Sequence, residues 1–259
     1  MSEAAIVAED LHKSFGPLCV LDGVSFTHER GRTLVVLGRS GTGKSVLLKT
    51  IIGLLDPERG RVRVLGQDIH RLDEFERQKA RRRMGYVFQD GALFDSLSVA
   101  DNVGFQLIQE RVDPARVRAR VDDALEQVGL QGVRDCLPSA LSGGMRKRVG
   151  VARAIVNQAE LILYDEPTSG LDPITTGVIN GIVRDLQRRL GSTAVVVTHD
   201  IASAFAIADA MLMLREGRVV AAGDPQDIRR SPDPWVQAFI GGGADARHYA
   251  ASGDDHVSA

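Results

Sequence analysis

Cysteine is nearly absent from this chain of 259 residues, which contains only Cys19 and Cys136. The two lie far apart in the sequence, and neither belongs to a C-x-x-C pattern or to a cysteine–histidine cluster. This scarcity excludes a fold that depends on a disulfide framework and a zinc site of recognisable spacing. It is typical of proteins that work in a reducing compartment.

Long apolar runs are missing as well. A helix needs about 18–20 consecutive apolar residues to cross a bilayer, and the best candidate, residues 46–55, is interrupted by Lys49. Residues 1–13 include acidic side chains and lack the apolar centre of a signal peptide. We therefore predict a cytoplasmic protein with no membrane-spanning segment.

The chain also lacks an excess of charge of either sign. Its 32 Lys and Arg residues nearly balance 34 Asp and Glu residues, for a formal net charge of −2. Because such a chain has no bulk positive field, we expect no nucleic-acid partner. The hydrophobic content of 44% and the charged content of 25% are those of an ordinary globular protein. The length suits one large domain, or one domain with an inserted lobe.

Short apolar runs are what the sequence does contain. A run of this length without alternation is typical of a strand buried on both faces, as in a parallel sheet covered by helices. Other stretches predict shorter strands, antiparallel and at the edge, the last of them with a hairpin turn at Glu216-Gly217. The sequence therefore predicts an α/β fold with a mostly parallel core and an antiparallel edge subdomain. The apolar runs are residues 34–37, 161–164 and 194–197, and the shorter strands are residues 6–15, 23–27, 61–64 and 212–222.

Between about residues 95 and 157 the pattern changes. Residues 114–129 are rich in arginine and acidic side chains and carry apolar residues at helical spacing, and residues 141–155 predict a second helix. We interpret this stretch as a helical lobe inserted in a single domain that spans residues 1–240. Residues 241–259 contain too few apolar side chains to pack, so we predict a flexible tail.

A glycine-rich motif follows the first apolar run and precedes a predicted helix. Its pattern, G-x-x-x-x-G-K-[ST], lets backbone N–H groups and the helix N-terminus bind the phosphates of a nucleotide. The lysine would bridge the β- and γ-phosphates, and the final hydroxyl would bind Mg²⁺. The alternative, a glycine-rich turn that matches by chance, is disfavoured by the flanking strand and helix. The motif consists of Gly38, Arg39, Ser40, Gly41, Thr42, Gly43, Lys44 and Ser45.

Two carboxylates, Asp165 and Glu166, come directly after the second apolar run. In P-loop proteins a carboxylate at this place holds Mg²⁺, which is the role we expect for Asp165. Glu166 could then polarise the attacking water. An Asp-Glu pair after a strand is by itself more often the start of a solvated loop, so this interpretation depends on the P-loop.

Two further features are ambiguous when taken singly. Residues 141–145 read LSGGM before a predicted helix, where the Ser142 hydroxyl and the N–H groups of Gly143 and Gly144 favour an anion site. The alternative is a helix N-cap preceded by a flexible turn. His199 follows the third apolar run, and a histidine at a strand end is more often structural than catalytic.

In this order the motifs are similar to those of ATP-binding cassette (ABC) ATPases. The similarity extends from about residue 6 to residue 240, and the LSGG signature separates this family from other P-loop proteins. No N-K-x-D motif is present, which disfavours a GTPase. The motifs that carry the resemblance are the P-loop, Gln89 after residues 86–88, LSGGM, residues 163–168, residues 169–172 and His199.

The resemblance implies a head-to-tail dimer in which each ATP lies between the P-loop of one copy and the signature of the other. Ser142, Gly143 and Gly144 would then contact the γ-phosphate of the second copy's nucleotide. Asp172 would link the two sites across the dimer.

The resemblance also assigns roles around the nucleotide. Gln89 would touch Mg²⁺ and the water, Glu166 would be the general base, and His199 would sense the γ-phosphate. Phe15 stands where the family usually has a tyrosine stacked on adenine, and a phenyl ring can also stack. Met145 stands where glutamine is common in the signature, which bears on the subfamily more than on catalysis.

The kind of ABC ATPase is narrowed by what the chain contains. It has one P-loop and one signature, unlike the translation factors, and it lacks the sustained heptads of the DNA-repair proteins. A transport subunit with a separate membrane permease remains.

Within the transport ATPases, residues 44–49, 91–95, 141–148 and 165–175 resemble the Mla and Mce lipid-transport systems of bacterial envelopes. This resemblance implies phospholipid transport through an integral membrane permease with a periplasmic Mce-type lipid-binding protein. The ATPase would lie on the cytoplasmic face of the inner membrane. The alternative is the ATPase of an importer for amino acids or other small polar solutes. A scaffold that binds ATP without hydrolysing it is disfavoured by Gln89, Glu166 and His199.

Two surface features complete the expectations. One is the loop that contains Gly91, Leu93 and Phe94. Its apolar side chains either pack into the core or line a groove that receives the membrane partner, and we favour the groove. The basic run of residues 81–83 could bind lipid headgroups, but a solvated helix end is the favoured interpretation.

Overall fold

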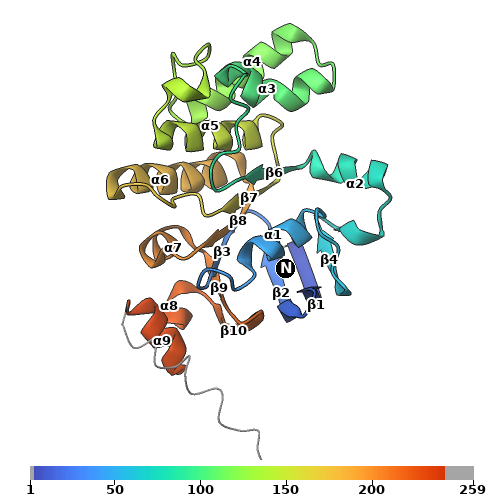
Figure 1. Ribbon diagram of the computed structural model, residues 1–259, viewed down its shortest axis with the longest axis vertical. Coiled ribbons are helices and arrows are strands. Elements are labelled where there is room, and N and C mark those ends of the chain that lie inside the picture. Colours follow the sequence, from blue (N-terminus) through green and yellow to red (C-terminus); the bar gives the residue numbers. More distant parts are fainter. Residues whose placement is uncertain (1–2, 243–259) are drawn as a thin grey trace, which may run out of the picture.

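Two separate sheets organise the chain in the computed structural model, which describes residues 3–242 (Figure 1). One sheet has six strands in the order β10-β9-β3-β8-β7-β6, and the other has four in the order β2-β1-β4-β5. The predicted α/β architecture, with a mostly parallel core and an antiparallel second sheet, is confirmed. Most of the predicted tail, residues 243–259, lies outside the described part of the chain.

The six-stranded sheet forms the centre of the molecule. Each of the three apolar runs becomes a strand, and β3, β8 and β7 lie side by side and parallel. The strands are β3 (Thr33–Leu37), β6 (Met84–Val87), β7 (Leu161–Asp165), β8 (Thr193–Thr198), β9 (Ala210–Arg215) and β10 (Arg218–Gly223).

Alternate residues of the central strands belong to two different cores. In β3, Leu34 and Val36 pack on the side of the four-stranded sheet, whereas Val35 and Leu37 pack on the opposite side. Both faces are therefore buried, which is why these strands are apolar throughout. The four-stranded sheet consists of β1 (Ala4–Phe15), β2 (Leu18–Glu29), β4 (Arg59–Val64) and β5 (Gln67–Asp68).

Helices cover the central sheet and extend the molecule upward in Figure 1. Four of them begin with the same dipeptide, an aspartate N-cap followed by proline at the first helical position, as at Asp172-Pro173 and Asp113-Pro114. The helices are α1 (Lys44–Ile51), α2 (Glu74–Arg81), α3 (Val99–Gln109), α4 (Pro114–Gln127), α5 (Gly143–Ile155), α6 (Pro173–Leu190), α7 (Ile201–Ile207), α8 (Pro225–Arg229) and α9 (Pro234–Ile240), with short 3₁₀ turns at Ile69–Arg71 and Pro138–Ala140.

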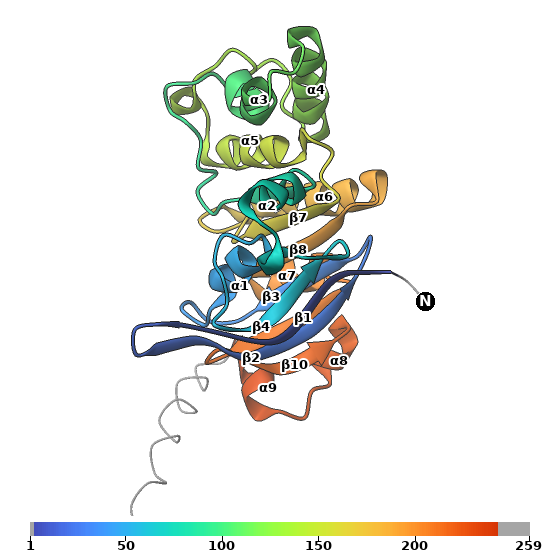
Figure 2. The same cartoon turned by 90° about the vertical axis from the view of Figure 1, so that its right-hand side faces the viewer.

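Helices α3, α4 and α5 pack on one another at one end of the molecule, above α6 and β7 (Figures 1 and 2). They lie between β6 and β7 in the sequence, as the predicted lobe does. The boundaries of that lobe, and of a single domain ending at residue 240, stay predictions.

The prediction for residues 212–222 was partly wrong. The hairpin turn at Glu216-Gly217 is present, and both residues have positive φ. However, β9 pairs in parallel with β3 inside the sheet, and β10 is the antiparallel edge strand. The reason is the connection through α7, because a strand that returns to the same sheet through a helical crossover runs parallel to the strand before it.

Two other elements also differ from expectation. Strand β2 is longer than the predicted residues 23–27 because it pairs with β1 along almost its whole length. Strand β6 was not predicted. Its four residues include Gly85, which lies against the backbone of α5, and an added Cβ would lie 2.4 Å from the carbonyl oxygen of Ala154. Among residues 3–242, no helix has the length and apolar character that a membrane crossing requires.

Substitution Gly85→Ala should destabilise the fold, because the methyl group has no space between β6 and α5. Overpacking of this kind costs about 1–3 kcal/mol, which lowers the melting temperature by several degrees in a chain of this size. Gly177→Ala, on the exposed face of α6 with nothing near the added Cβ, is the matched control. It should stabilise the protein by about 0.5–1 kcal/mol. Thermal unfolding checks both, and equal melting temperatures for Gly85→Ala and the wild type would contradict the packing.

Candidate functional site

The carboxyl ends of β3, β8 and β7 meet at one edge of the central sheet. Because these strands are parallel and adjacent, the loops that follow them lie together. The P-loop follows β3, Glu166 follows β7, and His199 follows β8. Three motifs that are far apart in the sequence thus form a single site.

The P-loop depends on its glycines. Gly41 and Gly43 have φ of +83° and +94°, a left-handed conformation that other residues avoid. A Cβ on Gly43 would also lie 2.6 Å from the carbonyl oxygen of Val20 in β2, which passes directly beside the loop. A curled glycine backbone that leads into a helix of two turns matches what phosphate groups require.

Lys44 folds back onto this loop. Its ammonium donates to the carbonyl oxygens of Gly38 at 2.8 Å and Arg39 at 3.0 Å, and it lies 3.4 Å from Oε1 of Glu166. Lys44 is 6% exposed and Glu166 is 8% exposed. A buried ammonium therefore stands between the P-loop and the carboxylate that follows β7.

The Asp165 carboxylate accepts hydrogen bonds from two hydroxyl groups. Ser45 donates to Oδ1 at 2.7 Å, and Tyr86 of the neighbouring strand β6 donates to Oδ2 at 2.9 Å. Burial, followed by the charge of Asp165, raises the pKa of Tyr86, so its hydroxyl stays protonated and remains a donor. The hydroxyl and carboxylate oxygens of Ser45 and Asp165 are hard ligands of the kind that Mg²⁺ prefers.

Glu166 adopts a strained backbone conformation. Its φ is +48°, which costs a non-glycine residue about 1–3 kcal/mol. Its N–H donates to the carbonyl oxygen of Val197 at 2.9 Å, which fixes the turn against β8. Its Oε2 accepts from the backbone N–H of His199 at 3.3 Å and from Nδ1 at 3.0 Å. Since an ionised carboxylate only accepts, Nδ1 carries the proton and Nε2 is left for another partner.

Gln89 and Phe15 lie at the rim of this site. Gln89 is exposed in the turn after β6, next to the strand that carries Tyr86. Phe15 is half-exposed at the tip of the β1–β2 hairpin, with the Lys13 ammonium 5.4 Å from the ring centroid. Val20 of the same hairpin lines a small pocket together with Gly41, Lys44 and Ser45, so the hairpin overhangs the P-loop.

The LSGGM motif is not brought to the P-loop of its own chain. It begins α5, and Figures 1 and 2 both show α5 separated from α1 by α6 and β7. Ser142 caps the helix, since its Oγ accepts from the N–H of Met145 at 3.2 Å. Gly144 lies against α6, and an added Cβ would meet the Thr175 methyl at 2.5 Å, whereas at Gly143 it would meet only the Arg146 guanidinium, at 3.9 Å.

Asp172 caps α6 from the loop that follows Glu166. Its Oδ1 accepts from the N–H groups of Ile174 and Thr175, and its Oδ2 accepts from the Thr175 hydroxyl. These hydrogen bonds, that of the hydroxyl foremost, lower the pKa of Asp172. An exposed, firmly ionised carboxylate thus stands beside the signature motif.

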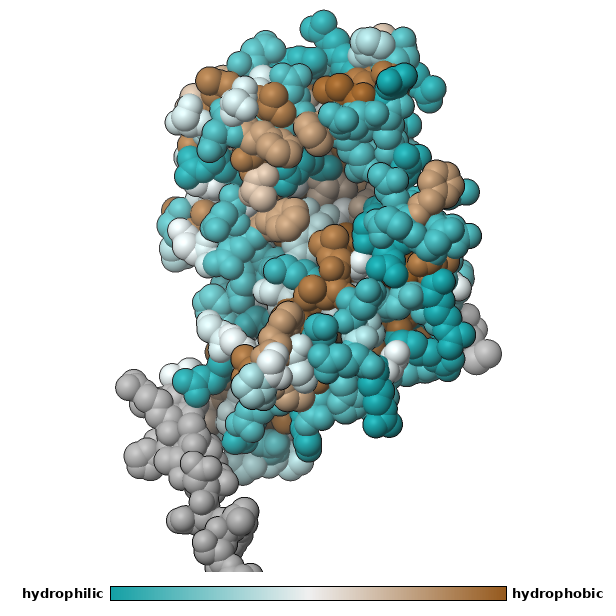
Figure 3. All heavy atoms as spheres, turned by 45° about the vertical axis from the view of Figure 1, so that its right-hand side comes forward, coloured by the Kyte–Doolittle hydropathy of each residue, from teal (hydrophilic) through white to brown (hydrophobic). Residues whose placement is uncertain are grey.

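A groove of about 420 Å³ opens beyond Gln89, between β6, α3 and α5. Phe94 lines it, is 44% exposed and packs on Phe105 with 4.7 Å between ring centroids. Leu93 packs against the core instead, so the two apolar residues have different roles. Asn102 holds Phe94 in place by accepting from its N–H at 2.7 Å and donating to its carbonyl oxygen at 3.0 Å. In Figure 3, apolar side chains gather in a diagonal band on one face of the molecule.

The basic side chains at the end of α2, residues 81–83, all contact other parts of the protein. Arg81 donates to the carbonyl oxygens of Ile52 and Gly53, Arg82 pairs with Glu110, and Arg83 pairs with Glu160. We expected a solvated helix end here rather than a lipid site. The three guanidinium groups are partly exposed, but each also pairs with a carboxylate of the protein.

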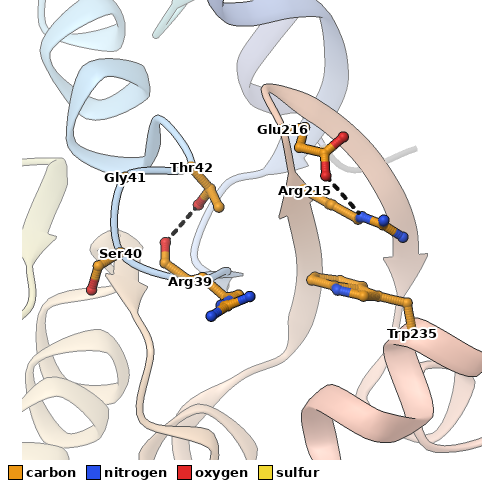
Figure 4. A pocket seen from close by; sticks show the side chains of 7 residues that line it. All are labelled: Arg39, Ser40, Gly41, Thr42, Arg215, Glu216 and Trp235. Atoms are coloured by element: carbon orange, nitrogen blue, oxygen red, sulfur yellow. Dashed lines mark hydrogen bonds and ion pairs between the residues drawn. The ribbon is translucent and has the colours of Figure 1, made fainter. Parts of the chain in front are cut away.

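A second pocket, of about 280 Å³, lies on the outer side of the P-loop (Figure 4). Arg39 and Thr42 form one wall, and the other wall comes from Arg215 and Trp235, with the Arg215 guanidinium 5.4 Å from the ring centroid. Neither Trp235 nor Tyr86 was recognised from the sequence. Their neighbours are remote in sequence, and no local spacing marks them.

Comparison with known proteins gives consistent matches. The profile of the family described as ABC transporter matches residues 21–169. The chain is 39% identical over 237 residues to the intermembrane phospholipid transport system ATP-binding protein MlaF of Escherichia coli (strain K12), a match that covers 91% of this chain and 88% of that protein. It is 40% identical over 239 residues to the probable ribonucleotide transport ATP-binding protein mkl of Mycobacterium leprae (strain TN), covering 92% and 69%.

Among solved structures, the chain is similar to the ATP-binding cassette MJ0796 in a dimeric, post-hydrolysis state bound to ADP and Pi. The TM-score is 0.78 and the identity is 31%, and the match covers 85% of this chain and 98% of that chain. The sequence comparison and the fold comparison therefore both find ATP-binding proteins of the same kind.

Two buried tyrosines of this site should respond oppositely to loss of the hydroxyl. Tyr86→Phe removes a donor from buried Asp165 and should destabilise the protein by about 1–3 kcal/mol. The Tyr164 hydroxyl is buried without a hydrogen-bond partner among the described residues, so Tyr164→Phe should be neutral or stabilising. Urea unfolding of the nucleotide-free protein measures both. A loss of stability in Tyr164→Phe that equals the loss in Tyr86→Phe would contradict the assigned hydrogen bonds.

Proposed function

This chain belongs to the ABC transporter family, and we propose that it is the ATP-hydrolysing subunit of a transporter that moves phospholipid between the membranes of a bacterial envelope. The observation that carries the proposal is that Glu166, at the edge of the central sheet, contacts Lys44 at 3.4 Å through one carboxylate oxygen and His199 at 3.0 Å through the other. A phosphate-binding cation, a carboxylate base and a histidine with one free ring nitrogen are the groups that hydrolysis of a terminal phosphate requires.

ATP enters between the hairpin and the P-loop. Phe15 stacks on the adenine, and the backbone N–H groups of residues 38–45 bind the phosphates. Ser45, Asp165 and Gln89 would hold Mg²⁺, which would supply positive charge against the phosphates. The existing hydrogen bond between Ser45 and Asp165 supports this assignment, because it gathers two hard oxygen ligands at the start of α1.

The charge of Lys44 is satisfied by two P-loop carbonyl groups and by Glu166. The phosphates compete for the same ammonium, and a Lys44 that turns to them releases Oε1 of Glu166. The freed carboxylate can then accept a proton from the attacking water. His199 keeps its Nδ1–H on Glu166 and directs Nε2 to the γ-phosphate.

The second half of the site comes from a second copy of the chain. Ser142 and the first N–H groups of α5 form a helix N-terminus that is separated from α1, the helix after the P-loop of the same chain, by α6 and β7. Such a group of donors binds an anion from elsewhere, and the dimeric MJ0796 cassette supports a head-to-tail arrangement. In this dimer Asp172 lies close to the other copy's site.

The groove beyond Gln89 receives an integral membrane permease, and the ATPase thereby lies on the cytoplasmic face of the inner membrane. Phe94 and Phe105 supply an apolar floor. Arg153 lines the same groove and donates to the carbonyl oxygens of Gly91 and Ala92, so the groove is joined to the loop that carries Gln89. Nucleotide-driven movement of that loop would then be transmitted to the permease.

Similarity to MlaF supports phospholipid as the cargo, passed on by a periplasmic Mce-type lipid-binding protein. Similarity to a probable ribonucleotide transport protein favours a second candidate, a small polar solute. The match to MlaF covers the larger share of the relative, which favours lipid.

Glu166→Gln should abolish turnover while preserving ATP binding, because the amide cannot accept the proton but keeps the shape of the carboxylate. A positioned general base contributes about 10²–10⁴-fold, so kcat should fall by at least 100-fold. The control is Glu160→Gln, just before the amino end of the same strand, where the carboxylate pairs with Arg30 and Arg83 far from the phosphates. Phosphate release and nucleotide binding are the measurements. A loss below tenfold in Glu166→Gln would rule out the base.

Deletion of the gene should change the lipid distribution of the envelope and leave solute uptake intact. The expected result is phospholipid in the outer leaflet of the outer membrane and sensitivity to detergent with chelator, rescued by the wild type but not by Glu166→Gln. Uptake of labelled ribonucleotides and amino acids, measured in the same strains, is the control. An unchanged envelope together with lost uptake of one of these solutes would replace lipid by the second candidate.

A further inference from the structure

Lys147 lies on the signature helix α5, one turn after Gly143. Its side chain extends out of the helical layer, which is the group of α3, α4 and α5. Its ammonium donates to the carbonyl oxygen of Ser169, in the loop that connects Glu166 to Asp172. The side chain is partly buried. The neighbouring basic residues of α5 behave differently, because Arg146 donates to Leu141 and Arg148 to the carbonyl groups of residues 128 and 129, all within the helical layer.

The loop that contacts Lys147 belongs to the nucleotide site. Ser169 belongs to the turn that starts at Glu166, since its N–H donates to the Glu166 carbonyl oxygen at 3.2 Å. Asp90 follows Gln89 directly, and the carboxylates of Asp90 and Glu166 both act electrostatically on Lys147. A single side chain of the signature helix thus holds the loop that runs from Glu166 to Asp172, and its charge is favoured by the carboxylates of Asp90 and Glu166.

Burial lowers the pKa of Lys147, while Asp90 and Glu166 oppose this change by favouring the charged form. A desolvated ammonium is costly without partners. The charged form of Lys147 is therefore stabilised by the Ser169 carbonyl and by the two carboxylates. Moving α5 away from the loop of Ser169 would leave this ammonium without its hydrogen bond, and that cost holds the helix and the loop together.

We propose that Lys147 is a positioning residue for ATP hydrolysis, which fixes the turn of Glu166 to the signature helix so that the general base is aligned when the signature engages nucleotide. Lys147 does not touch ATP in this scheme. It acts through Ser169, and it makes the position of α5 and the geometry of Glu166 interdependent. The inference rests on the proposed ATPase function of this site.

The test compares steady-state ATP hydrolysis by Lys147→Met, Lys147→Arg and Arg148→Met with the wild type. Methionine keeps the length and removes the charge, so kcat should fall by about 10–100-fold, the effect of a misplaced catalytic group. KM for ATP should stay unchanged, because Lys147 does not bind the nucleotide. Lys147→Arg, which can still reach the carbonyl, should recover most of kcat. Arg148→Met, which removes a cation of the same helix, should retain it.

Urea unfolding of each variant separates a positioning role from a purely structural one. A fall in kcat at unchanged unfolding midpoint, reversed in Lys147→Arg, supports the proposal. Wild-type kcat in Lys147→Met overturns the proposal. A rise in KM for ATP that accounts for the lost activity also overturns it. So does a fall in kcat that accompanies an equal loss of stability in both Lys147→Met and Lys147→Arg. If the wild type itself hydrolyses no ATP, the proposed function fails and the inference fails with it. Full turnover in Lys147→Met overturns this inference alone.

Discussion

The parallel pairing of β3 with β8 and of β8 with β7 is the constraint on which the rest of this protein depends. It sets the P-loop, the turn of Glu166 and His199 at one edge, and the backbone hydrogen bond from Glu166 to Val197 extends that pairing past the end of β7. The strained φ of Glu166 is tolerated because the turn is held on several sides, by β8, by Lys44 and by His199. A side chain oriented in this way has little freedom left to lose during a reaction, which is the advantage of a preorganised site.

Features that are local in the sequence were predictable. An apolar run shows a buried strand, and the spacing of glycine, lysine and serine shows a phosphate loop, because each depends on neighbouring residues. The fold class followed from these runs, and the P-loop, Asp165, Glu166 and His199 could be placed at a common edge once the strands were taken as parallel.

Contacts between elements could not be predicted in this way. The hydrogen bond from Tyr86 to Asp165 requires the register of β6 against β7, and the contact of Lys147 with Ser169 requires the packing of α5 against the loop before α6. Strand β6 itself was missed because glycine is a poor strand former, and its reason for being there, the close approach of α5, is a tertiary fact. The predicted edge position of β9 was wrong for a similar reason. The hairpin turn identifies β10 as the neighbour on one side of β9, but it gives no sign of β3 on the other side.

The pairing of β3 also has a consequence for how the protein is made. Thr33 pairs with Ala194 of β8 on one side, and Leu34 pairs with Ala210 of β9 on the other. The strand that precedes the P-loop therefore cannot pair with either neighbour until most of the chain has left the ribosome. Non-local pairing of this kind slows folding, and until it is complete the apolar strands stay exposed to aggregation. Residues 34–37 are therefore an apolar segment that stays exposed in the nascent chain until residues 194–213 have been synthesised.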